Sequence, residues 1–156
     1  MNRPELRFPQ HLIEKATRSD NEFGWKEADV LNVIEAAKQM QMATIGGQVQ
    51  YVFPDATCEL YWLSYDSEDR KRNEDWVTFC SRTAIECSEK FKQLETIDIE
   101  KEAIKTFGIL KIKQQSGVNL SQYRVFILYF IDKETYSERF PKHPILWLFN
   151  KLKIKK

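Results

Sequence analysis

The chain has 156 residues, with 24 lysines and arginines against 23 aspartates and glutamates, and 13% of its residues are aromatic. A chain of this length buries a core large enough to need neither disulfides nor a structural metal, and its aromatic content excludes intrinsic disorder. A net charge of only +1 does not imply a general electrostatic attraction to nucleic acid. We therefore expect a single globular domain over residues 1–156.

Charge is unevenly distributed along the chain. Residues 1–100 carry 12 basic and 19 acidic side chains, whereas residues 101–156 carry 12 basic and 4 acidic ones. Either the two parts pack together and neutralise each other, or an acidic surface is left for a basic partner.

The amino-terminal segment and the cysteines both indicate a cytoplasmic protein. Residues 1–9 contain charges and prolines where a secretory signal requires an apolar run, and the longest apolar stretch, residues 125–131, is far too short to span a membrane. Three cysteines cannot form a complete set of disulfides. Cys80 and Cys87 lie on one face of a predicted helix, which is typical of small core residues.

The first third of the chain shows mainly helical periodicity. Apolar residues at helical spacing predict a short helix over residues 9–17 and a longer amphipathic helix over residues 26–41. Between them, Ser19 followed by Glu22 has the form of a capping box, and Gly24 delays the start of the second helix.

A β-hairpin follows. Residues 43–53 predict a strand, with a two-residue period over residues 48–53. The Gly46-Gly47 pair permits a bulge or tight bend just before this alternating part. Pro54 and Asp55 supply turn chemistry, and a second strand is predicted over residues 58–65. Strict alternation places one set of side chains on one face (Leu60, Trp62 and Ser64) and another on the opposite face (Glu59, Tyr61, Leu63 and Tyr65).

The remaining elements complete the predicted fold. Residues 74–94 form the clearest amphipathic helix, residues 99–106 a short helix, and residues 107–113 either a strand or a continuation of that helix. The β-branched and aromatic run 123–131 predicts a central strand buried on both faces, with a buried helix as the alternative. A further helix is predicted over residues 144–156. Together these elements predict an α+β fold, a small mostly antiparallel sheet with an N-terminal β-hairpin, packed against amphipathic helices.

The sequence contains no motif that is typical of catalysis or metal binding. The two histidines, His11 and His143, lie near opposite ends of the chain, and no Cys or His spacing matches a zinc site. The acidic residues 66–69 lack the glycine and closing glutamate of a calcium loop. We therefore expect no catalytic residues, no cofactor and no metal.

Large aromatic residues and acids lie close together between residues 61 and 75. Aromatic side chains supply burial energy at protein interfaces, and surrounding charges speed and select the encounter. The alternative is that Trp62 and Trp76 are core residues and that the acids solubilise a loop. The predicted partner-binding residues are Tyr61, Trp62, Tyr65, Asp66, Glu68, Asp69, Glu74 and Asp75.

The hairpin segment Ala43-Thr-Ile-Gly-Gly-Gln-Val-Gln-Tyr-Val-Phe-Pro-Asp-Ala-Thr-Cys-Glu-Leu-Tyr-Trp62 resembles segments of small bacterial proteins encoded beside secreted polymorphic toxins. These are immunity proteins of the contact-dependent growth inhibition kind. The resemblance implies a cytoplasmic protein that binds one cognate toxin domain, often a nuclease, and blocks its active site or its access to substrate. Because immunity proteins have many unrelated folds, it implies no topology and no catalytic residue.

These observations predict a non-enzymatic immunity protein that neutralises a toxin domain by protein–protein binding, with no membrane and no obligate nucleic acid as partner. One alternative is a nucleic-acid-binding module that uses the basic region from Lys111 to Lys156. Another is a small enzyme whose site is assembled from dispersed residues.

Overall fold

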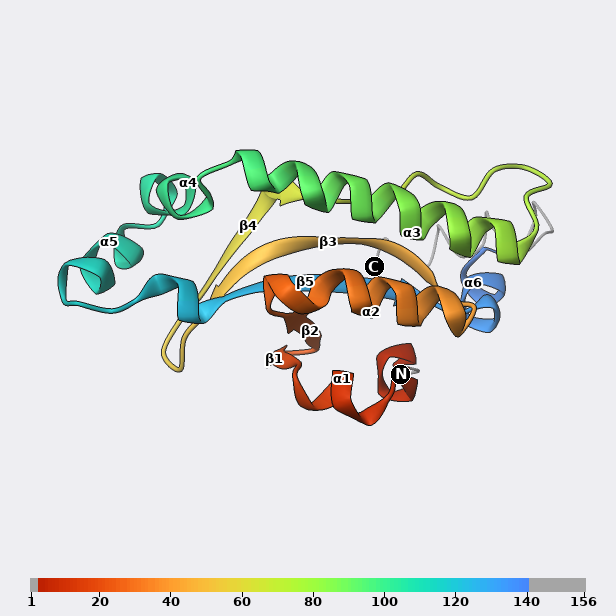
Figure 1. Cartoon of the computed structure of the whole chain (residues 1–156), viewed down its shortest axis with the longest axis horizontal. Coiled ribbons are helices and arrows are strands. Elements are labelled where there is room, and N and C mark those ends of the chain that lie inside the picture. Colours follow the sequence, from red (N-terminus) through yellow and green to blue (C-terminus); the bar gives the residue numbers. More distant parts are fainter. Residues whose placement is uncertain (1–2, 141–156) are drawn as a thin grey trace, which may run out of the picture.

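The structure, a computed structural model, describes residues 3–140 and has the predicted α+β architecture (Figure 1). In this part of the chain, five strands form one antiparallel sheet in the order β1-β2-β5-β3-β4. The strands are β1 (Thr17–Ser19), β2 (Glu22–Trp25), β3 (Ala43–Val52), β4 (Thr57–Ser64) and β5 (Arg124–Ile131). The α-helices are α1 (Gln10–Glu14), α2 (Glu27–Gln39), α3 (Trp76–Gln93), α4 (Ile99–Thr106), α5 (Gly108–Gln115) and α6 (Lys133–Arg139). Short 3-10 turns occupy Pro4–Arg7, Leu94–Thr96 and Leu120–Tyr123.

Strand β5 is the middle strand of the sheet, which confirms the predicted central strand. It pairs with β2 on one side, where Gly24 lies opposite Ile127, and with β3 on the other, where Gln50 lies opposite Val125. Its residues 125–128 are all buried. A strand that pairs on both edges and is buried on both faces has a continuous apolar sequence, and such a sequence is what predicted this strand.

Helices α2 and α3 lie side by side and pack against β3 (Figure 1). Val33 and Ile34 of α2 and Phe91 of α3 belong to the same buried core as Phe126 and Leu128 of β5. The ring of Phe91 meets the ring of Phe126 edge to face, with 5.2 Å between ring centres. The amphipathic stripes of the two helices therefore form one core with the sheet, as the periodicity predicts.

The segment between α1 and α2 differs from the prediction. Ser19 and Glu22 do not form a capping box; they pair across a second hairpin, β1–β2, with Asp20 in the left-handed region at φ 51°. Aspartate tolerates this conformation better than most residues, so local chemistry suits a tight turn as well as a helix cap. Trp25 ends β2 and is buried, and its indole N–H donates to the carbonyl of Leu12 at 2.8 Å.

The hairpin of β3 and β4 is confirmed, but its strict alternation is wrong beyond Leu60. Leu60 lies opposite Val49 and Ser64 lies opposite the adjacent Gln48, so three residues of β4, numbers 61–63, are extra. Extra residues in one strand form a bulge and change which side chains face the core. As a result Leu60 and Tyr65, predicted on opposite faces, are both core residues.

The Gly46-Gly47 pair permits a shift in the pairing of β3 with β5 and leaves room for the ring of Tyr65. The pairing of β3 with β5 shifts between Thr44 and Gly46, as the predicted bulge requires. A Cβ atom at Gly47 would overlap the carbonyl oxygen of Ile127 and the ring of Tyr65. The absence of a side chain here therefore lets Tyr65 lie against the sheet.

The carboxyl-terminal half contains two short helices after α3. Helix α4 lies where it was predicted. For segment 107–113 neither predicted alternative holds as stated, because residues 108–113 belong to a separate helix, α5, instead of a strand or a continuation of α4. Phe107, at φ −111° and ψ 100°, has extended backbone geometry and separates the two helices. The helix predicted over residues 144–156, and His143, lie outside the described residues.

Candidate protein-binding surface

Three side chains of α3, those of Arg82, Glu86 and Lys90, hold the acidic loop, residues 66–75, against the helix, and Arg82 makes most of these contacts. Arg82 Nε donates to Glu74 Oε1 at 2.7 Å, and Arg82 Nη1 donates to Glu86 Oε1 at 2.8 Å. Its Nη2 donates to the carbonyl oxygen of Asp69 at 3.0 Å. Charge-assisted bonds from one planar guanidinium fix both the helix and the loop, so Arg82 organises this region.

Glu74 is committed to that arginine. Its side chain is only 6% exposed. Hydrogen bonding to Arg82 lowers the pKa of the Glu74 carboxyl to about 2, and the backbone N–H of Lys71 also donates to it. Glu74 was a predicted partner-binding residue, but the structure places it inside the protein's own ion-pair network.

Other acids of the loop also have internal roles. Asp75 is the N-cap of α3, and its Oδ1 accepts the backbone N–H of Thr78 at 3.0 Å. Asp66 Oδ1 accepts the backbone N–H of Gly47 at 3.2 Å. Glu68 and Asp69 are exposed, and within residues 3–140 their carboxylates form no hydrogen bond or ion pair. Only these two acids of the loop are therefore free of an internal contact there.

Tyr65 and Trp76, at the two ends of this region, are buried. The Tyr65 hydroxyl donates to the carbonyl of Ile127, and burial raises the pKa of this phenol well above its usual value. The Trp76 indole N–H donates to the carbonyl of Gln41 at 2.7 Å. Trp76 therefore belongs to the core, as the alternative interpretation held, and Tyr65 offers no surface to a partner.

The aromatic pair, Tyr61 and Trp62, is different because the bulge in β4 brings it to the surface. Tyr61 is 72% exposed and Trp62 is 37% exposed. The two rings meet edge to face with centres 5.3 Å apart, and Trp62 stacks on Phe107 at 6.2 Å. β4 is an edge strand, and bulges in edge strands are common beside functional sites. The pair is thus both exposed and held in place.

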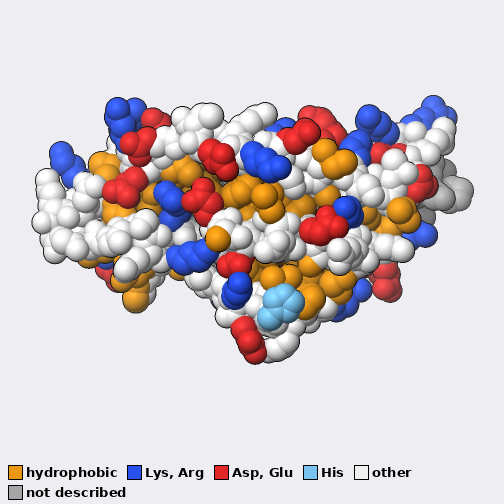
Figure 2. Space-filling view, in the orientation of Figure 1, with side chains coloured by type: hydrophobic (Ala, Val, Ile, Leu, Met, Phe, Trp, Pro, Cys, Tyr) orange, Lys and Arg blue, Asp and Glu red, His pale blue; other side chains and the backbone are white. Residues whose placement is uncertain are grey.

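Phe107 connects the aromatic pair to the α4–α5 arm, residues 98–116, at one end of the molecule (Figure 1). Further apolar side chains are exposed on α5, with Ile112 67% and Ile109 37% exposed. Figure 2 shows hydrophobic surface interrupted by charged side chains over this end of the molecule. Large exposed apolar groups gathered in one place are typical of protein-binding surfaces.

The arm was not among the predicted site residues. Its signal in the sequence is weak, because two short helices with mixed charges resemble any solvent-exposed helix. Only the stacking of Phe107 on Trp62 joins them to the predicted aromatic residues, and this contact links positions 45 apart in sequence.

Within residues 3–140, the structure has no group of three or more His, Cys, Asp or Glu side chains placed to hold a metal ion. In the same range no helix combines the length and apolar character of a membrane span. The three cysteines are buried, and burial raises the pKa of Cys80 to about 11 and that of Cys87 to about 12. Thiols with raised pKa values are poor nucleophiles at neutral pH, as expected of core residues.

Comparison of the chain with family models, with curated proteins and with solved structures finds no match.

Proposed function

We propose that this protein is an immunity protein, which binds a cognate toxin domain in the cytoplasm and blocks its active or substrate-binding surface. The observation that carries the proposal is the exposed aromatic pair on the bulged edge strand β4. The hairpin that displays the pair is also the segment that resembles immunity proteins. Aromatic anchors of this kind supply much of the binding energy at protein interfaces.

The alternative, a nucleic-acid-binding module, draws less support from the described residues. Among the basic residues of its region, Lys113 is paired with Asp55 at 2.9 Å and Arg124 with Glu27 at 3.3 Å. Basic side chains that are already paired contribute less to a track for phosphates. We therefore do not propose it as a second function.

The test begins with the gene immediately upstream. The carboxyl-terminal domain that it encodes is expressed in bacterial cells with and without this protein. We expect growth arrest when the domain is expressed alone and normal growth when the two are expressed together. An upstream domain that is harmless, or one whose toxicity this protein does not relieve, contradicts the proposal.

A matched pair of variants then tests the surface. Tyr61→Ala/Trp62→Ala removes two anchors, and each anchor of this kind contributes about 2 kcal/mol or more, or about 30-fold in Kd. The control, Leu31→Ala/Ile85→Ala, removes two exposed apolar side chains from α2 and α3. We expect the first variant to lose protection and the control to keep it, with both folded by circular dichroism.

A further inference from the structure

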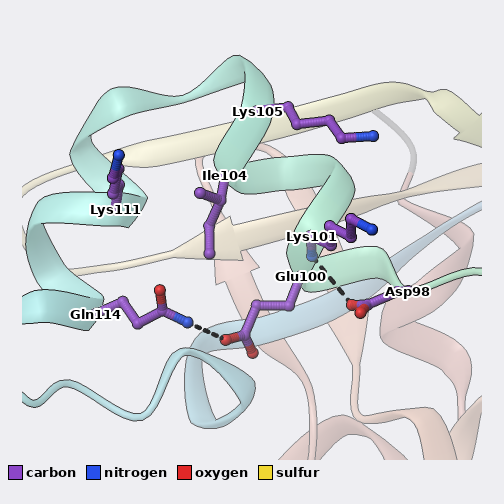
Figure 3. A pocket seen from close by; sticks show the side chains of 7 residues that line it. All are labelled: Asp98, Glu100, Lys101, Ile104, Lys105, Lys111 and Gln114. Atoms are coloured by element: carbon purple, nitrogen blue, oxygen red, sulfur yellow. Dashed lines mark hydrogen bonds between the residues drawn. The ribbon is translucent and has the colours of Figure 1, made fainter.

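A shallow cleft of about 710 Å³ lies between α4 and α5 (Figure 3). Ile104 lines it from α4, and Lys111 lines it from α5. One side is closed by a contact between the two helices, because Gln114 Nε2 donates to Glu100 Oε1 at 2.8 Å. The cleft therefore has an apolar floor and a border fixed by a hydrogen bond.

The two carboxylates that line the cleft are occupied by the protein's own groups. Asp98 is the N-cap of α4, and its Oδ1 accepts the backbone N–H of Lys101 at 3.0 Å. Glu100 accepts the amide of Gln114. Each acid therefore has a structural role in holding the arm together.

The lysines of the cleft form fewer contacts with the protein's own charged groups than its carboxylates form with its donors. Lys105 pairs with Glu102 at 3.0 Å, whereas Lys101 and Lys111 form no ion pair with any residue of the described range 3–140. Two lysines without an ion-pair partner in this range thus line the cleft on either side of the half-buried Ile104 (Figure 3). This combination suits a ligand that carries negative charge and an apolar group together.

We propose that the cleft receives an acidic segment of the partner protein, with an apolar side chain of that segment on Ile104 and its carboxylates beside Lys101 and Lys111. The inference rests on the proposed function in that the partner is the cognate toxin domain. Three lysines and two carboxylates line the cleft, so its net charge favours an acidic occupant over a basic one. Ile104 favours a polypeptide, because an apolar side chain can pack on it whereas a phosphate cannot. The aromatic pair and the cleft then form one interface, joined through Phe107.

The test compares two charge-reversed variants. Lys101→Glu/Lys111→Glu alters the cleft, and Lys92→Glu/Lys133→Glu makes the same change of net charge at exposed lysines of α3 and α6. An exposed ion pair contributes up to about fivefold in affinity, and reversal adds repulsion, so we expect toxin-domain binding to weaken about tenfold or more in the first variant. The second variant is expected to bind within about twofold of the wild type. Both are expected to keep the wild-type melting temperature.

The outcomes separate this inference from the proposed function. If the protein neutralises the toxin and the cleft variant binds like its control, the cleft inference is wrong and the function stands. If the toxin is not neutralised at all, the function is wrong. The cleft is then tested with a synthetic peptide in which glutamates flank a pair of leucines, compared with a peptide in which glutamines replace the glutamates.

We expect the acidic peptide to bind the wild type more tightly than the glutamine peptide, and to lose this preference in the Lys101→Glu/Lys111→Glu variant. Equal binding of the two peptides contradicts the inference. The same measurement is made with a single-stranded RNA oligomer at physiological salt. If the RNA binds the wild type more tightly than the acidic peptide does, and the Lys101→Glu/Lys111→Glu variant loses this binding, the inference is wrong and the cleft is assigned to nucleic acid.

Discussion

The acidic loop and the α4–α5 arm are both charged and exposed, but their charges are organised in opposite ways. In the loop, the arginine of α3 and several backbone N–H groups occupy the carboxylates, as with Glu74 and Asp75. The loop acids left without such a bond in residues 3–140 are Glu68 and Asp69. In the arm the carboxylates Asp98 and Glu100 are also bonded, and the groups left without an ion pair in residues 3–140 are the lysines Lys101 and Lys111. A cluster of like charges in a sequence therefore does not predict a binding surface until the partners of each charge are known.

The two tryptophans near these regions give the largest expected difference. Trp76 is buried at the base of the acidic loop, and Trp76→Ala is expected to lower the free energy of unfolding by about 3–5 kcal/mol. Trp62 is partly exposed, so Trp62→Ala is expected to cost less than half as much. Urea denaturation of the two variants measures this difference. Equal losses of stability would mean that Trp62 is as much a part of the core as Trp76.

Glu74 is expected to make the next largest contribution. The Glu74→Gln substitution removes a carboxylate bonded to Arg82, and hydrogen bonds to charged groups contribute about 1.5–3 kcal/mol. The control is Glu68→Gln, because the Glu68 carboxylate has no such bond within the described residues. Thermal denaturation at neutral pH is expected to show a lowered melting temperature for the first variant only.

The pH dependence of that difference follows from the pKa of Glu74. Its pKa of about 2 in the folded state lies below the usual glutamate value of 4.5, so ionised Glu74 stabilises the folded state fully above pH 4.5. This contribution is lost as the pH falls from 4.5 through about 2. The stability difference between the wild type and Glu74→Gln is therefore expected to shrink over this range, and a difference that stays constant would show that Glu74 acts by packing alone.

A smaller effect is expected from a glycine of the arm. A Cβ at Gly108 meets no atom within 4 Å, and the residue begins α5. Gly108→Ala is therefore expected to stabilise the protein by about 0.4–1 kcal/mol by restricting the unfolded chain. Gly117, at φ 90°, is the contrasting position, where alanine is expected to destabilise. Differential scanning calorimetry that finds the same sign for both variants would contradict this distinction.

The smallest effect on stability is expected from the free acids of the loop. Glu68→Lys/Asp69→Lys changes exposed side chains, and such substitutions usually stay within about 0.5 kcal/mol each. If the arm and aromatic pair form the interface, the association rate with the toxin domain is expected to stay within about threefold of the wild type. A much slower association, measured by stopped-flow fluorescence, would place the interface at the acidic loop.

Much of the fold could be predicted from the sequence because its signals are periodic. The apolar stripe of α3 and the apolar run of β5 each extend over several turns or residues, and the structure has both elements within a few residues of the predicted limits. The β1–β2 hairpin was missed because three- and four-residue strands are too short to show a period. The bulge in β4 was missed because extra residues break the alternation on which the prediction depends.

Less of the candidate site could be predicted. Six of the residues that were singled out are exposed in the structure, namely Tyr61, Trp62, Asp66, Glu68, Asp69 and Asp75, although Asp66 and Asp75 also accept backbone N–H groups. Tyr65 and Glu74 were singled out on the same grounds and are committed to internal hydrogen bonds. Neighbouring residues of one short segment thus differ in whether their side chains are exposed or bonded inside the protein, and composition does not distinguish the two.

The sequence by itself determined the elements whose residues interact with near neighbours, such as the helix that Asp75 caps and the turn at Pro54 and Asp55. Only the tertiary structure decided which aromatic and acidic side chains reach the surface, because the groups that bury or bind them come from distant parts of the chain. The carbonyl that accepts the Tyr65 hydroxyl is 62 residues away in sequence, and Arg82 reaches Glu74 across the start of α3. Such contacts depend on how strands and helices pack, so the local periodicity of the sequence does not predict them.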